Sequence, residues 1–83
     1  MSSIYDACDA VESREDLASF VEHLLAAQRA GELENDRLDL FLDGLAGWTY
    51  DMPGYFAGRG EATPEQPSWG LVARMLLAAS AYD

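Results

Sequence analysis

The segment Trp69–Tyr82 constrains the fold more than any other part of the chain. It carries one charged side chain, Arg74, and its large side chains spread over roughly 240° when the chain is wound at about 100° per residue. A helix that packs on one side needs a much narrower apolar stripe. We therefore expect residues 68–82 to form the buried central helix of a small all-α bundle, with packing partners on at least two sides.

Two earlier segments also carry apolar residues at helical spacing. Ser13, followed by acidic residues, is a typical helix start and Gly31 a typical helix end, which predicts a helix over residues 14–30. Asn35 is predicted to cap a third helix over residues 36–50. The stripes expected to pack are Leu17, Phe20, Val21, Leu24 and Leu25 in the first helix, and Leu38, Phe41, Leu42, Leu45 and Trp48 in the second.

Two segments are less regular. Ser3 and Asp6 form a capping-box pattern, which predicts a short helix within residues 1–12. Residues 47–67 are rich in glycine, proline and aromatic residues, and Met52–Tyr55 places proline and glycine where a type II turn favours them. This predicts one long aromatic loop that either folds over the bundle as a lid or forms part of a binding surface. We expect the 83 residues to form a single domain.

Composition excludes several classes of function. The net charge of −10 opposes binding to nucleic acid and to anionic lipid. Cys8 and His23 are the single residues of their types, so the chain has no internal disulfide and no Cys/His cluster for zinc. The sequence has no apolar run of membrane-spanning length and no basic, apolar secretion signal at its start. We expect a cytoplasmic protein that does not bind membranes.

The sequence offers no convergent set of catalytic residues. His23 lies on the flank of its helix without an orienting partner, so an ordinary solvated side chain is expected. Asp36, Asp39 and Asp43 could line one helix face and chelate a hard cation, but calcium-loop spacing is missing and a solvated acidic face is the ordinary interpretation. We expect no catalytic residues, no metal site and no cofactor.

Several short patterns, spread over nearly the whole chain, together resemble a family of short bacterial single-domain proteins of unknown function. They are Ser13-Arg-Glu-Asp-Leu with Phe20 and Leu24, the Asn35 cap, Leu42-x-x-Leu45-Ala-x-Trp48, Asp51-Met with Tyr55, Pro67-Ser-Trp69, and Ala73-x-x-Leu76-x-Ala78-Ala79-x-x-Tyr82 followed by an acid. The chain departs from the pattern at Leu33, where a tryptophan is expected. The resemblance implies a free-standing domain, and small acidic domains of this kind often act as immunity proteins beside toxins.

The charge is concentrated in the first half of the chain. Residues 1–43 hold 11 acidic residues and 3 arginines, a net charge of −8, against −2 for the 4 acidic residues and 2 arginines of residues 44–83. Such an acidic surface either keeps a small domain soluble or steers a basic partner toward aromatic anchors.

These features favour a non-catalytic inhibitor that binds a basic protein, most concretely an immunity protein (antitoxin) against a cationic toxin. The alternatives are a DNA-mimicking inhibitor of a nucleic-acid-binding defence enzyme and a structural or oligomerisation module. A monomer or weak homodimer is expected. The residues expected to bind the partner are Asp36, Asp39, Asp43, Tyr50, Asp51 and Tyr55.

Overall fold

The computed structural model of the chain describes residues 3–82 and is all-helical over that range. Residues 1–2, part of the segment expected to contain the short N-terminal helix, and residue 83 lie outside the described range. The four helices are α1 (Ile4–Asp9), α2 (Arg14–Arg29), α3 (Leu38–Gly58) and α4 (Trp69–Ala79). The all-α prediction is therefore confirmed.

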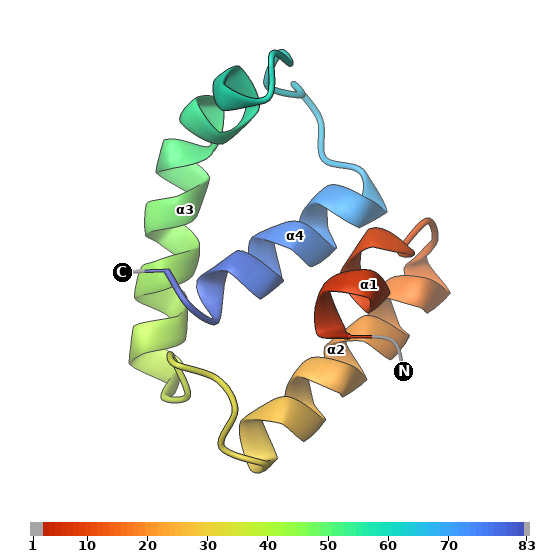
Figure 1. The fold of residues 1–83 in the computed structure, drawn as a ribbon, viewed down its shortest axis with the longest axis vertical. Coiled ribbons are helices and arrows are strands. Elements are labelled where there is room, and N and C mark those ends of the chain that lie inside the picture. The colour runs from red at the N-terminus through yellow and green to blue at the C-terminus, as the bar shows by residue number, and fades with distance from the viewer. Residues whose placement is uncertain (1–2, 83) are drawn as a thin grey trace.

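Helix α4 lies between α3 on one side and α1 with α2 on the other (Figure 1). It packs against each of these helices, and α1 also packs against α2. In the described part of the chain the backbone of α3 comes close to that of no helix except α4. Helix α4 thus has packing partners on two sides, and its burial is uneven: Ala73, Leu77 and Ala79 are buried, whereas Trp69 in the first turn is exposed.

Three helices begin where the sequence predicts, each with a serine cap. The hydroxyl oxygens of Ser3, Ser13 and Ser68 accept hydrogen bonds from the backbone N–H groups three residues later. These bonds satisfy donors that the first turn of a helix leaves free. At the other end of α2, Gly31 has φ of +74°, the left-handed conformation that suits glycine just beyond a helix.

The core lies where α1, α2 and α4 meet. Its buried cluster consists of Cys8, Val11, Phe20, Leu24, Ala73 and Leu77. Phe20 is only 1% exposed and is the largest of the fully buried side chains. On α3, by contrast, the buried large side chains are Trp48 and Met52, which lie in the middle of that helix rather than near its start.

The prediction of a long loop over residues 47–67 is wrong for the first half of that segment, because α3 continues to Gly58. Pro53 lies inside the helix, so no type II turn forms there. Proline within a helix removes one hydrogen bond and costs about 3 kcal/mol. Here the affected carbonyl belongs to the exposed Thr49, where water can satisfy it. Packing between aromatic rings on the two sides of Pro53 favours continuation of the helix. The rings of Trp48 and Tyr55 lie 5.4 Å apart.

The predicted role of Asn35 is also wrong. Helix α3 begins after Arg37, which makes no side-chain capping bond. The Asn35 side chain instead donates two hydrogen bonds of 2.8 Å, to the carbonyl oxygens of Ala79 and Tyr82 at the end of α4. Because the last carbonyls of a helix have no donor within it, a buried amide here satisfies groups that would otherwise be costly to bury. Asn35 thus holds the α2–α3 linker against the end of α4.

A candidate interaction surface on α2 and α3

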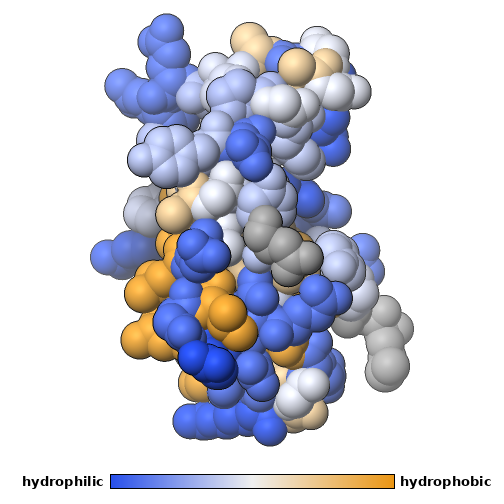
Figure 2. Space-filling model, turned by 90° about the vertical axis from the view of Figure 1, so that its left-hand side faces the viewer, coloured by the Kyte–Doolittle hydropathy of each residue, from blue (hydrophilic) through white to orange (hydrophobic). Residues whose placement is uncertain are grey.

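The first turns of α3 present their leucines to solvent. The sequence predicts that Leu38, Leu42 and their stripe pack inward, yet Leu38 is 73% exposed and Leu42 is 52% exposed. The buried face of α3 runs instead through Gly44, Trp48 and Met52. In Figure 2, apolar surface gathers over the lower part of the molecule, the part where α3 begins, with hydrophilic surface around it.

Gly44 explains why α3 turns this face toward α4. A Cβ atom at this position would lie 2.7 Å from the carbonyl oxygen of Ala79 and 2.9 Å from that of Tyr82. Only glycine allows the backbones to approach this closely. The end of α4 therefore packs on the glycine face of α3. Leu38 and Leu42, which lie about a third to nearly half a turn away around the helix, are left outside.

Helix α2 exposes part of its own stripe. Phe20 and Leu24 are buried as predicted, but Val21 is 43% exposed and Leu25 is 46% exposed. Their positions, i and i+4, place them one above the other on the helix surface. Packing against α1 and α4 uses one side of the predicted stripe, and the other side of the stripe remains exposed.

A groove of about 390 Å³ lies between these surfaces, and we call it the apolar groove. Its lining comes from α2, from the α2–α3 linker, from the start of α3, and from Leu76 of α4: Val21, Leu24, Leu25, Gln28, Leu33, Asn35, Asp36, Arg37, Leu38, Phe41 and Leu76. The backbones of α2 and α3 stay apart in the described chain, and Leu76 of α4 lines the groove together with residues of both. Gln28 links the two sides at the linker by donating a 3.3 Å hydrogen bond to the carbonyl oxygen of Asp36.

The sequence gives one sign of the apolar groove, which is a surplus of apolar side chains over what a small core can bury. Two neighbouring helices each carry an apolar stripe of five residues, although a domain of this size has a small core to fill. Which residues of the two stripes stay outside depends on the contact at Gly44 and on the unexpected position of Asn35. Neither contact has a sequence signal of its own.

The structure brings together three of the six residues predicted to bind a partner. Asp39, Asp43 and Tyr50 are exposed, and their spacing of i, i+4 and i+11 aligns them along one face of α3. Tyr50 is 86% exposed and so is available as an anchor. The carboxylate of Asp39 forms a 2.8 Å ion pair with Arg37, a surface contact that contributes little to stability. Leu42 lies beside these residues and extends their face toward the apolar groove.

Asp36 lines the apolar groove but precedes α3, which begins at Leu38. The three aspartates proposed to line one helix face therefore do not do so. Within residues 3–82, no group of three His, Cys, Asp or Glu side chains is arranged to hold a metal ion.

The other two predicted residues have structural contacts. The Tyr82 hydroxyl donates a hydrogen bond to the Asp51 carboxylate, and this bond raises the pKa of Tyr82. Tyr55 is partly buried: its ring packs edge-on against Phe56 at 5.0 Å, and the Arg59 guanidinium lies 5.4 Å from its centre. Both contacts hold α3 or its end in place, so Asp51 and Tyr55 lie apart from the exposed face formed by Asp39, Asp43 and Tyr50.

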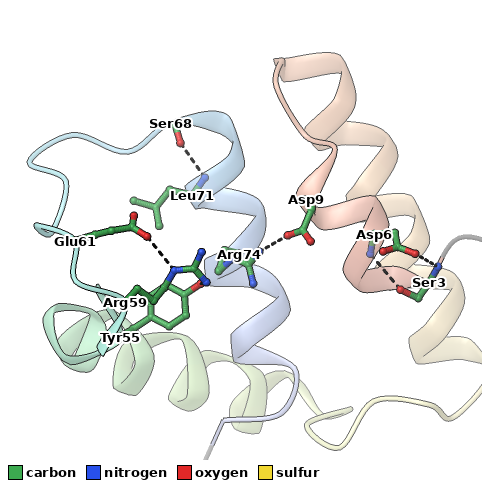
Figure 3. A network of polar contacts seen from close by, with 9 residues as sticks. All are labelled: Ser3, Asp6, Asp9, Tyr55, Arg59, Glu61, Ser68, Leu71 and Arg74. Carbon is green, nitrogen blue, oxygen red and sulfur yellow. Dashed lines mark hydrogen bonds and ion pairs between the residues drawn. The ribbon is translucent and has the colours of Figure 1, made fainter. Parts of the chain in front are cut away.

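A second, polar pocket of about 280 Å³ lies between α1, the start of α4 and the end of α3. Each of its arginines has an acidic partner: Arg74 pairs with Asp9, and Arg59 pairs with Glu61 at 3.1 Å (Figure 3). Cys8 borders this pocket from the core, and burial raises the pKa of its thiol, which disfavours the reactive thiolate. Two ion pairs therefore border the pocket.

The family model for a family of unknown function, DUF7660, matches residues 13–83. The chain therefore belongs to this family, as the resemblance seen in its motifs implies. No curated protein and no solved structure shows significant similarity to it. Among the helices described, none combines the length and apolar character needed to cross a membrane.

Proposed function

We propose that this member of the family is a non-catalytic protein-binding domain that inhibits a basic partner, in the manner of an immunity protein that neutralises a cationic toxin in the cytoplasm. The observation that carries the proposal is the mixed surface on α3, where the exposed Leu38 and Leu42 lie beside Asp39 and Asp43. Exposed leucines next to carboxylates are a costly arrangement for a surface whose only task is solubility.

Charge gives this surface its expected partner. The net charge of −10 produces a negative potential that speeds encounter with a basic protein, most strongly at low ionic strength. The uncharged part of the surface, which includes the exposed Tyr50, then supplies contacts that slow dissociation. The charged part of the surface is therefore expected to set mainly the association rate constant, and the uncharged part mainly the dissociation rate constant.

The arrangement supports a compact protein contact better than mimicry of DNA. A mimic requires carboxylates spaced like phosphates along an extended surface. On α3 the carboxylates of Asp39 and Asp43 are interleaved with leucines, and that of Asp39 is paired with Arg37. The third candidate, an oligomerisation module, would bring together chains that each carry a charge of −10.

The proposal is tested with the basic protein captured from native cells by the immobilised chain. Replacing Asp39 and Asp43 together with lysine should slow association at least about tenfold at low salt and flatten its salt dependence. The matched control is Glu61→Lys with Glu65→Lys, which makes the same change in net charge at two exposed residues outside α3. It should slow association less. Equal effects of the two double variants, or no captured basic protein, would remove the proposal.

A further inference from the structure

The apolar groove adds an uncharged contact area to the mixed surface on α3. Its two sides come from α2 and from the start of α3, and its floor contains the buried Leu24 and the half-buried Leu76. Each side exposes apolar side chains: Val21 and Leu25 on α2, and Leu38 on α3. An apolar trough between two helices is the shape that receives the apolar face of a third helix.

The packing of the domain also favours a helical occupant. Helix α4 lies between α2 and α3, and the backbones of those two helices stay apart in the described chain. In a four-helix bundle the corresponding space is filled by another helix, packed about 8–10 Å from its neighbours. Helix α1 does not fill it, since α1 packs against α2 and α4 and none of its residues lines the groove.

Charge decides between a second copy and a different protein. Asp36 is the acidic residue of the lining, and Asp39 and Asp43 lie outside the lining on α3. Arg37, also in the lining, is paired with Asp39. A second copy would bring an equally acidic surface against this rim. A helix with lysine or arginine flanking its apolar face would instead place opposite charges at the rim.

We propose that the apolar groove receives an amphipathic helix of the basic partner. Its apolar side chains lie against Leu25, Leu38 and Leu76, and its basic side chains lie toward Asp36, the carboxylate in the groove lining. This inference rests on the proposed function, because it names the element of the basic partner that the acidic domain recognises. It further predicts that affinity depends on groove leucines that carry no charge.

The probe is a fluorescein-labelled synthetic peptide of about five helical turns, or about 18 residues, with leucines on one face and lysines on the other. Two control peptides accompany it: one has the same composition scrambled so that the leucines share no face, and the other has glutamate in place of lysine. Fluorescence anisotropy with the full chain should show saturable binding of the first peptide and at least about tenfold weaker binding of both controls.

The chain offers a matched pair of variants for this experiment. Leu38→Gln removes an exposed leucine from the groove lining, and Leu40→Gln makes the same change on the same helix at an exposed leucine outside the lining. The first should weaken binding of the peptide about tenfold or more, and the second should change it less than about twofold. Circular dichroism checks that both variants keep the helical content of the parent chain.

Three results would overturn the inference: equal binding of the amphipathic and scrambled peptides, equal effects of the two variants, or no saturable binding of the amphipathic peptide. A dimer in sedimentation that Leu38→Gln dissociates would also overturn it, because the occupant would then be a second copy. The proposed function fails separately. If Leu38→Gln leaves affinity for a captured basic protein unchanged while the Asp39 and Asp43 reversal slows association, the groove inference falls and the proposed function stands.

Discussion

The two sides of α4 are packed differently. Toward α1 and α2, side chains such as Phe20 and Cys8 are almost completely buried, and the contact is a conventional apolar core. Toward the start of α3, the contact is made by the backbone of Gly44 and by the amide of Asn35, while Leu38 and Leu42 face solvent. Both regions carry apolar side chains, but these are buried on the first side and exposed to solvent on the second. One stabilises the fold, and the other is available to a partner.

The largest expected effect contrasts one side chain from each region. Phe20→Ala removes a side chain that is 1% exposed, so it should lower the free energy of unfolding by about 3–5 kcal/mol, a large share of the stability of so small a domain. Leu38→Ala should change it by less than about 0.5 kcal/mol, because that side chain already lies in water. Urea titration of the two variants measures both values. A loss above about 2 kcal/mol for Leu38→Ala would mean that the start of α3 belongs to the core.

An intermediate effect tests the glycine contact that separates the regions. In Gly44→Ala the added methyl group meets backbone oxygens at 2.7 and 2.9 Å that cannot move without shifting the end of α4. We expect a loss of about 1–3 kcal/mol. Gly54→Ala is the matched control, since it lies in the same helix with nothing within 4 Å of the added atom. Alanine there should be neutral or should stabilise by up to about 1 kcal/mol. Thermal unfolding distinguishes the two, and equal melting temperatures would refute the close-contact argument.

The sequence predicts those elements of the fold that depend on local signals. The serine caps, the glycine end of α2 and the central position of α4 follow from capping chemistry and apolar periodicity. The continuation of α3 through Pro53 does not, because the ring packing that favours it joins Trp48 to Tyr55, seven residues further along the same helix. Turn preference at the proline and ring packing across it point in opposite directions there, and packing decides.

The candidate surface was predicted only in part for a related reason. Acidic residues and an exposed tyrosine can be recognised by type and spacing, which identifies Asp39, Asp43 and Tyr50. The exposure of Leu38 and Leu25 cannot be recognised from the sequence in this way, because it depends on which face of each helix meets α4. That choice is made by Gly44 and Asn35, whose contacts join segments more than 30 residues apart.

The smallest expected effect concerns Asp51, an exposed residue that the sequence assigns to the partner surface and that contacts Tyr82 in the structure. Its carboxylate accepts the Tyr82 hydroxyl, so the neutral phenol is favoured in the folded chain and the pKa of Tyr82 is raised above its usual value near 10. The contribution to stability is therefore fully present below the unfolded pKa and is lost as the pH rises through the higher folded pKa.

This shift can be measured as the difference between the alkaline absorbance titrations of the parent chain and its Tyr82→Phe variant. Asp51→Ala should bring the pKa of Tyr82 down toward the ordinary value, because the hydrogen bond is the largest cause of the shift. Asp43→Ala, an exposed acid on the same helix, should leave it unchanged. If Asp51→Ala leaves the titration of Tyr82 as it was, then Asp51 is free of this contact. It would then return, with Asp39 and Asp43, to the surface available to a partner.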